Sequence, residues 1–489
     1  MSIYRNTTYN LLGSVIPLAA SLVTIPIYLG LIGEARYGVL AIAWLLLGYF
    51  GLFDLGLGRA TAQRIAALRD APAKELAQTF WTALVLNVGF GVVGGLILWP
   101  VATYCFGHVF KVEEALRPEI AAAVPWLALA VPAATLSGVL SGALQGQERF
   151  LELNLISVAG TALFQLVPLS VAWIHGPDLG WLLPAALLAR LVTLVALLGL
   201  CRRSVFLGYP PCFIWSQAGA LLRFGGWVTV TAFVGPMMVI LDRFVIGVLG
   251  GAAAVTYYTV PFQLAERTAI FPDALSSALF PRLATSWKDE THRLVDEALR
   301  TLAVVMTPLV LLGVLCIGPF LMWWIGWDFA NRATRVAQIL LLAFWANSFA
   351  RIPYAQLQAQ GQPDRVAQCH LAEVVPYFGL LYLGLSLFGL VGAAVAFSLR
   401  VLVDLLLLSA LAGSLWRILR TLRIPTLLLG LSLMLANGIS LDRPLEVALV
   451  MLLLLTTLVW AWWAAPEGVR GLARDIPSRY LPRLNSHGE

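Results

Sequence analysis

The sequence predicts an all-α polytopic membrane protein with about 14 transmembrane helices, arranged as two six-helix lobes that form a parallel internal repeat, plus two C-terminal helices. Of the 489 residues, 60% are apolar and only 12% are charged, whereas an ordinary soluble domain carries about a quarter charged residues. Apolar runs of about 20 residues, the length that crosses a bilayer, recur from end to end. Similar segments also recur in the two halves. One membrane domain therefore accounts for the whole chain.

The predicted helices lie between charged residues, glycines and prolines. The first six are expected at 9–31, 38–60, 78–104, 119–145, 153–175 and 179–201, and the first is interpreted as a retained helix because no cleavage site follows it. The next six are expected at 221–249, 254–282, 297–324, 333–358, 366–388 and 389–411, and the last two at 422–440 and 444–464. These spans predict an N-terminal lobe at 1–203, a cytoplasmic linker at 204–220, a second lobe at 221–414, and a final segment at 415–489 with a basic tail.

The distribution of basic residues predicts the orientation of the chain. With the N-terminus in the cytoplasm, the inside loops carry roughly three times as many Lys and Arg as the outside loops, which by the positive-inside rule places both termini in the cytoplasm. The net charge of +6 is thus mainly a topology signal. It does not indicate a nucleic-acid partner, because the basic residues are spread over many loops without aromatic residues between them.

Three matches at nearly one offset indicate the repeat. The segment QGQERF at 145–150 matches QGQPDRV at 360–366, and LGLIG at 29–33 matches IGVLG at 246–250. Arg190 corresponds in the same way to Arg400, and the members of each match lie about 215 residues apart. Six helices per copy is an even number, so both copies enter the membrane in the same orientation. Parallel repeats of this kind are typical of secondary transporters, which bind substrate between the halves.

Two predicted helices carry a polar face. At about 100° per residue, the polar residues of each helix share an arc of roughly 80° to 120°. They are Asn10, Ser14, Pro17, Ser21, Thr24 and Tyr28 in the first helix, and Thr259, Gln263, Glu266, Arg267, Asp273 and Ser277 in the eighth, which is expected to bend at Pro272. Such groups are costly in lipid, so each face lines either a wet cavity or a helix contact held by hydrogen bonds.

Arg267 lies near the predicted bilayer midplane, and the planar donor fork of a guanidinium suits phosphate, which favours an anionic substrate. The candidate substrate-binding residues are Arg267, Gln263, Arg243, Arg59, Arg351, Asn10, Ser14 and Ser21. The candidate coupling or gating residues are Asp273, Glu266, Asp54 and Asp242. An alternative role, as gates or structural locks that hold the lobes together, is open for Asp54 with Arg59 and for Asp242 with Arg243. We expect a structural ion pair between Arg400 and Asp404, which are at i,i+4 spacing.

The sequence predicts no catalytic residue, metal site or cofactor. The five cysteines are scattered, the histidines form no HExxH motif, and there is no Walker loop and no GxSxG motif.

Residues 25–60, 241–284 and 357–404 resemble the oligosaccharide flippases (Wzx-type polysaccharide transporters) of the multidrug/oligosaccharidyl-lipid/polysaccharide exporter superfamily. The resemblance implies a central cavity formed by helices 1, 2, 7 and 8. Through it, undecaprenyl-pyrophosphate-linked sugar would pass to the outer leaflet of the bacterial cytoplasmic (inner) membrane by alternating access, for cell-surface polysaccharide biosynthesis. The implied partners are this lipid-linked oligosaccharide, membrane lipid, a coupling H+ or Na+, and polysaccharide assembly proteins.

Three alternatives stay open at this point. The last two helices exceed the twelve that are common among these flippases, and lipid II flippases have fourteen. A drug/cation antiporter of the same superfamily is the second alternative. A membrane glycosyltransferase or polymerase is the third, but such enzymes need a larger external loop than the one at about 104–118, so we expect a transporter that is not an enzyme.

Overall fold

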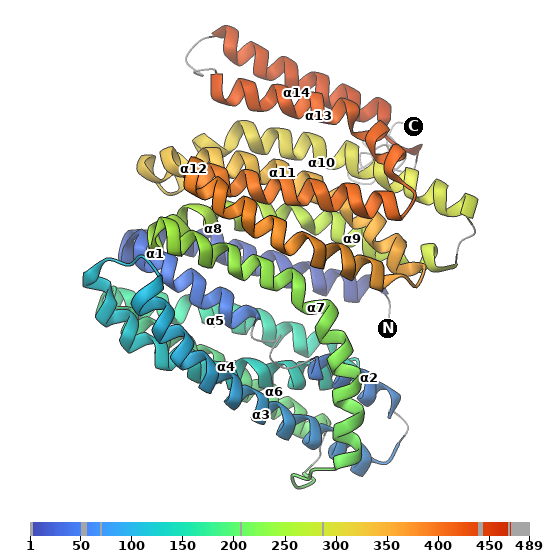
Figure 1. Cartoon of the computed structure of the whole chain (residues 1–489). Coiled ribbons are helices and arrows are strands. Elements are labelled where there is room, and N and C mark those ends of the chain that lie inside the picture. Colours follow the sequence, from blue (N-terminus) through green and yellow to red (C-terminus); the bar gives the residue numbers. More distant parts are fainter. Residues whose placement is uncertain are drawn as a thin grey trace, which may run out of the picture. The chain divides into compact units, whose positions relative to one another are not determined.

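The computed structural model describes residues 3–49, 56–68, 71–205, 208–285, 288–438, 444–467 and 470. Its α-helices are α1 (Ile3–Tyr49), α2 (Leu57–Ala67), α3 (Ala73–Tyr104), α4 (Arg117–Gly146), α5 (Phe150–His175), α6 (Leu179–Ser204), α7 (Trp215–Gly250), α8 (Ala252–Glu266), α9 (Ile270–Thr285), α10 (Lys288–Trp324), α11 (Trp327–Ala359), α12 (Pro363–Leu411), α13 (Leu415–Gly438) and α14 (Pro444–Ala464) (Figure 1). Short helices η2 (Cys105–Val109), η3 (Glu114–Leu116) and η4 (Arg267–Ala269) connect some of them. None of the described residues forms a β-strand.

The predicted all-α polytopic membrane fold is confirmed. Ten helical stretches of the described residues are long and apolar enough to cross a bilayer. Two long elements each extend over more than one predicted helix. α1 covers 9–31 and the start of 38–60 with an interruption at Gly33 (φ 77°, ψ 168°), and α12 covers 366–388 and 389–411 with an interruption at Gly389 (φ 60°, ψ −144°). Glycine adopts such positive φ values without the steric cost that a side chain imposes. The described residues of the fourteen predicted spans are therefore helical except at the interruptions, such as Gly56 (φ 69°) within the predicted helix 38–60.

The predicted helix at 254–282 is not one regular α-helix. It consists of α8, a 3-10 turn at Arg267–Ala269, and α9. Pro272 has no N–H to donate to the carbonyl four residues before it, and its ring crowds that carbonyl. The carbonyl belongs to Thr268, inside the 3-10 turn. In place of the expected bend at Pro272, the structure has a 3-10 turn before it, at Arg267–Ala269.

The first compact unit comprises residues 1–259. Within it α4 packs against α2, α3 and α6, while α5 packs against α1 and α6. Glycines permit close approach of α2 and α4, since a Cβ atom on Gly142 would lie 2.0 Å from the carbonyl oxygen of Gly58. Close backbone contact at small residues is the usual way in which membrane helices gain packing energy without a hydrophobic driving force.

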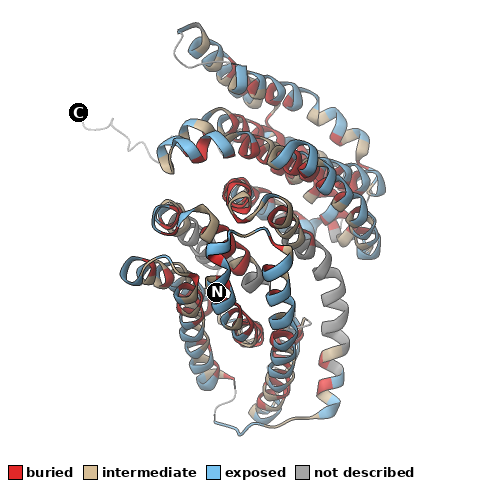
Figure 2. Cartoon of the chain, turned by 60° about the vertical axis from the view of Figure 1, so that its left-hand side comes forward, coloured by how far each residue is buried: buried red, intermediate tan, exposed pale blue. Residues whose placement is uncertain are grey.

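The second compact unit comprises residues 260–489. Its helix α11 contacts α9, α10 and α12, and 78% of its membrane segment is buried, against 17% for α14, so α11 is the core of this unit. Helices α13 and α14 pack on α10. Buried residues lie on the helix faces that meet neighbouring helices, while outer faces are exposed (Figure 2). Exposed leucines and valines on those outer faces suit a lipid environment.

Local backbone structure recurs in the two halves of the chain. Gly251 (φ 86°, ψ 173°) repeats the conformation of Gly33. At the ends of α4 and α11, the Arg149 N–H donates to the Leu144 carbonyl at 3.0 Å and the Gln362 N–H donates to the Leu357 carbonyl at 2.9 Å. These recurrences at the expected offset support the internal repeat. The lobe limits 1–203 and 221–414, the linker 204–220 and the final segment 415–489 stay a prediction.

Candidate functional site: charged residues at membrane depth

The interruption between α8 and α9 exposes charged side chains in the middle of a predicted membrane span. Glu266 and Arg267 are both exposed, and Gln263, one turn before them, is half-buried. Asp273 and Ser277 on α9 are exposed as well, whereas Thr259 is buried. Charged groups at this depth require water or polar partners rather than lipid. The exposure of Arg267 agrees with the expected wet surface, and its role in substrate binding stays a prediction.

Asp273 and Arg351 form an ion pair between α9 and α11. The Arg351 guanidinium donates to the Asp273 carboxylate, and the Ser276 hydroxyl donates to the Arg351 carbonyl oxygen at 3.4 Å. The Arg351 side chain is 34% exposed and the Asp273 side chain is 49% exposed, so the pair reaches the surface of the second unit. The sequence singled out both residues separately, Arg351 for substrate and Asp273 for coupling. The structure joins them, so a change at either one acts on the other.

Asp242 and Arg243 form a buried ion pair on α7. Arg243 Nη1 lies 2.7 Å from Asp242 Oδ1, with side-chain exposures of 3% and 1%. The Arg243 guanidinium also lies 5.6 Å from the ring centroid of Tyr258 on α8, at the distance of a cation–π contact. Both residues lie on α7, so the pair itself does not join two lobes, and their expected roles in substrate binding and gating stay predictions.

The polar face of the first helix is partly a helix–helix contact. The Thr24 hydroxyl donates to Gln165 Oε1 at 3.0 Å, and the Tyr28 hydroxyl donates to the Gln165 carbonyl oxygen at 2.6 Å. Gln165 on α5 escaped the sequence interpretation because a single amide in an apolar helix gives no pattern. Ser21 is half-buried. Hydrogen bonding between helices therefore accounts for this end of the polar face.

The structure leaves the roles of four other predicted residues untested. Arg59 is exposed on α2. Asp54 lies outside the described residues, as do the side chains of Asn10 and Ser14, so their expected roles stay predictions.

A buried charge cluster joins the two halves of α12. Arg400 Nε lies 3.2 Å from Glu373 Oε2, and His370 Nε2 lies 3.3 Å from Asp404 Oδ1. The expected pair of Arg400 with Asp404 is therefore wrong. The reversal of the chain at Gly389 brings the two halves side by side, so Arg400 and Asp404 each contact a residue across the hairpin instead of each other. The ring of Tyr354 on α11 stacks on His370.

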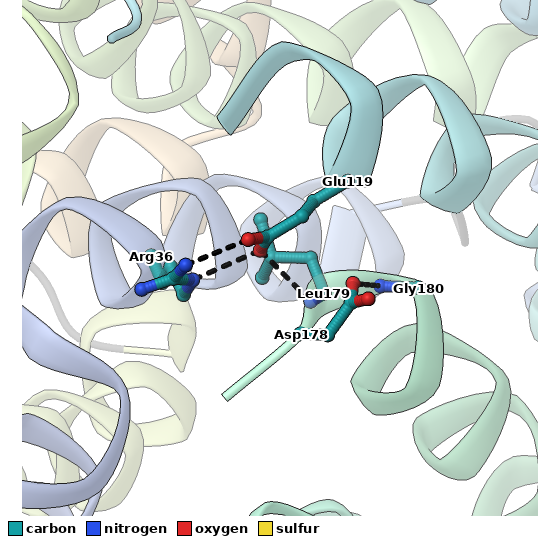
Figure 3. A network of polar contacts seen from close by, with 5 residues as sticks. All are labelled: Arg36, Glu119, Asp178, Leu179 and Gly180. Carbon is teal, nitrogen blue, oxygen red and sulfur yellow. Dashed lines mark hydrogen bonds and ion pairs between the residues drawn. The ribbon is translucent and has the colours of Figure 1, made fainter. Parts of the chain in front are cut away.

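A polar network joins three helices at one end of the first unit. Arg36 on α1 donates to Glu119 on α4 through Nε at 2.9 Å and Nη2 at 2.6 Å, a two-pronged contact (Figure 3). The Leu179 N–H points to the same carboxylate at 3.4 Å, and Asp178 caps α6 by accepting from the Gly180 N–H at 2.7 Å. The network ties α1 and α4 to the start of α6.

Metal-binding chemistry has no support in the part of the chain that the structure describes. No group of three or more His, Cys, Asp and Glu residues is close enough there to hold a metal ion.

Comparisons with known proteins identify the family. The sequence model of a family described as "Polysaccharide biosynthesis protein" matches residues 30–330. A Shigella flexneri protein named "Putative O-antigen transporter" is 30% identical over 410 residues, which cover 83% of this chain and 97% of that protein. The resemblance to oligosaccharide flippases is thereby confirmed.

Solved structures confirm the fold. The lipid II flippase MurJ in an inward closed conformation aligns with a TM-score of 0.72 at 11% identity, covering 97% of this chain and 99% of that one. An inward-facing multidrug resistance transporter of the MATE family aligns with a TM-score of 0.70 at 15% identity, covering 83% of this chain and 98% of that one. From the match of the family model and the full-length likeness to its Shigella relative, the chain belongs to the family of polysaccharide biosynthesis proteins.

Proposed function

We propose that this protein is a flippase that moves polyprenyl-pyrophosphate-linked oligosaccharide across the bacterial cytoplasmic membrane by alternating access, for cell-surface polysaccharide biosynthesis. The observation that carries the proposal is the likeness to the Shigella protein named as an O-antigen transporter, which extends over 97% of that protein. Both termini are cytoplasmic in this proposal, as the basic inside loops indicate. The protein transports without catalysing a reaction.

The charged residues at membrane depth support a substrate with a phosphate group. The exposed Arg267 offers a guanidinium donor fork, and the adjacent Glu266 supplies a counter-charge while no substrate is bound. In this proposal the pyrophosphate and sugars pass through a water-filled route between the lobes, and the polyprenyl tail stays in lipid. The route between the lobes, its coupling ion (H+ or Na+) and its polysaccharide assembly partners are parts of the same proposal.

Lipid II flipping is the second candidate. The likeness to the lipid II flippase MurJ covers 97% of this chain, including the two C-terminal helices that exceed the usual twelve. Lipid II also carries a polyprenyl pyrophosphate, so the chemistry of the head group is shared. A drug/cation antiporter is the weaker alternative, because an exposed arginine at membrane depth repels a cation.

Complementation in two bacterial strains separates these functions. In a strain that lacks its own O-antigen transporter, expression of this chain is expected to restore O-antigen on surface lipopolysaccharide, measured by gel electrophoresis and antibody labelling. In a strain depleted of its lipid II flippase, no rescue of growth is expected. Rescue of the second strain alone would replace the proposed substrate by lipid II. Failure in both, with normal abundance in the membrane, would contradict both flippase assignments.

A further inference from the structure

A cavity of about 720 Å3 lies in the second unit, among α10, α13 and α14. It is bounded by the first half of α10, the start of α13 and the end of α14, so it sits where these three helices leave the apolar zone. Cavities of a few hundred Å3 are the usual size of small-molecule sites. None of the residues proposed above for transport lines it.

Four arginines face one acid in this cavity. Arg300, Arg417, Arg420 and Arg470 line it together with Asp296. Arg417 is engaged, since its Nη1 lies 2.9 Å from Asp296 Oδ2. Arg300 and Arg420 are exposed and have no carboxylate partner among the described residues. The cavity therefore carries a surplus of positive charge and presents guanidinium donors that suit a phosphate group.

Tryptophans border the same cavity. Trp416 and Trp463 are 70% and 76% exposed, and Trp460 lies one turn before Trp463 on α14. Arg470, which also lines the cavity, donates to the carbonyl oxygen of Trp463. Tryptophan side chains collect at the level of lipid head groups because one end of the indole is apolar and the other donates a hydrogen bond. The cavity therefore lies at head-group depth.

We propose that this cavity binds the head group of an anionic phospholipid. The phosphate diester accepts hydrogen bonds from Arg300 and Arg420, and the acyl chains lie along the exposed apolar side chains of α13, such as Leu427 and Leu431. Basic pockets between membrane helices commonly bind anionic lipid head groups. A small soluble anion would use the arginines but not the surrounding tryptophan and leucine side chains, so an amphiphilic ligand fits better.

Lipid binding to the purified full-length protein tests this proposal. The protein in detergent is titrated with phosphatidylglycerol or with phosphatidylcholine, and bound lipid is counted by native mass spectrometry. We expect selective binding of phosphatidylglycerol. The double variant Arg300→Gln/Arg420→Gln is expected to bind it about tenfold or more weakly, since each basic residue adds to the attraction of an anionic head group. The double variant Arg300→Lys/Arg420→Lys, which keeps the charge, should retain most of the binding.

Arg293→Gln is the matched control, because Arg293 is an exposed arginine of α10 that does not line the cavity. It is expected to bind phosphatidylglycerol like the wild type. An equal loss in this control would reduce the effect to general charge attraction and overturn the proposal. Unchanged binding of phosphatidylglycerol by the double Gln variant would also overturn the proposal. If the double variant does not fold, the single variant Arg420→Gln is tested in its place by the same criterion. Preferential capture of undecaprenyl pyrophosphate over phosphatidylglycerol would assign the cavity to that lipid instead. All these measurements are independent of the proposed flippase function.

Discussion

At the scale of single residues, the sequence revealed which charges lie at membrane depth but not how they pair. An ionisable residue in an apolar run is visible at once, as Arg267, Asp273 and Glu373 were. Pairing depends on which helix lies opposite. The i,i+4 rule led to Asp404 as the partner of Arg400, whereas the structure pairs Arg400 with Glu373, 27 residues earlier. Spacing along one helix cannot show a contact that a chain reversal creates.

Arg267 is the first residue to test, because it is exposed at membrane depth beside the helix interruption. Arg267→Ala is expected to abolish export of surface glycan while the abundance of the protein stays normal, and Arg267→Lys should restore part of it, since lysine keeps the charge but loses the planar fork. Surface glycan is measured with antibody on whole cells. Arg335→Gln, at an exposed arginine near the start of α11, serves as the control. Full export by the Ala variant would remove Arg267 from the mechanism.

The Glu373 and Arg400 pair is expected to stabilise the hairpin of α12. Glu373→Ala leaves the Arg400 guanidinium, whose side chain is 15% exposed, without its acid. Removing one member of a fully buried ion pair typically costs about 3–5 kcal/mol, and the partial exposure of Arg400 places the expected loss at or below the lower end of this range. The double variant Glu373→Leu/Arg400→Met removes both charges and should recover much of this loss. Thermal unfolding in detergent measures both. A double variant that is less stable than Glu373→Ala would contradict this expectation. The loss in Glu373→Ala would then come from the missing ion pair itself and not from the charge left without a partner.

At the scale of elements, the helix positions followed from sequence because apolar runs and glycine or proline boundaries repeat at bilayer length. Gly33 and Gly389 mark reversals that were read correctly as helix ends. The 3-10 turn at Arg267–Ala269 was not predicted, because a proline disturbs the turn before it and the length of that disturbance depends on packing. The interruption lies at Arg267, the residue that we propose contacts the substrate.

Close contact of the two halves of α12 at Gly384 and Gly392 gives an element-scale prediction. A Cβ atom on Gly392 would lie 1.9 Å from the Gly384 carbonyl oxygen, so Gly392→Ala must push the helices apart. We expect a loss of about 1–3 kcal/mol, the usual cost of overpacking. Gly379→Ala is the control, because nothing lies within 4 Å of the added Cβ there. It should stabilise the helix slightly through the higher helix propensity of alanine. Equal unfolding temperatures for the two variants would contradict this packing.

At the scale of the whole molecule, the repeat was visible in sequence and is supported by recurring turns, but the lobe limits could not be derived from it. Contacts determine which helices form one unit, and α7, which the sequence assigned to the second lobe, packs on α1, α2 and α3 of the first unit. Such contacts depend on side chains from distant segments. For a transporter that alternates between two access states, a ligand or ion drives the change only if it binds one state better than the other.

Asp273 is the residue through which we expect an ion to bias the access states. Its carboxylate accepts from Arg351 and is about half exposed, so a proton or cation that binds it must release Arg351 and thereby alter the contact of α9 with α11. In reconstituted vesicles, Asp273→Asn is expected to flip lipid-linked oligosaccharide at a rate that no longer depends on an H+ or Na+ gradient. Asp328→Asn, at an exposed acid at the start of α11, should keep the dependence of the wild type. Dependence that survives in Asp273→Asn would leave its ion pair with a structural role only, and the coupling ion would have to act elsewhere in the chain.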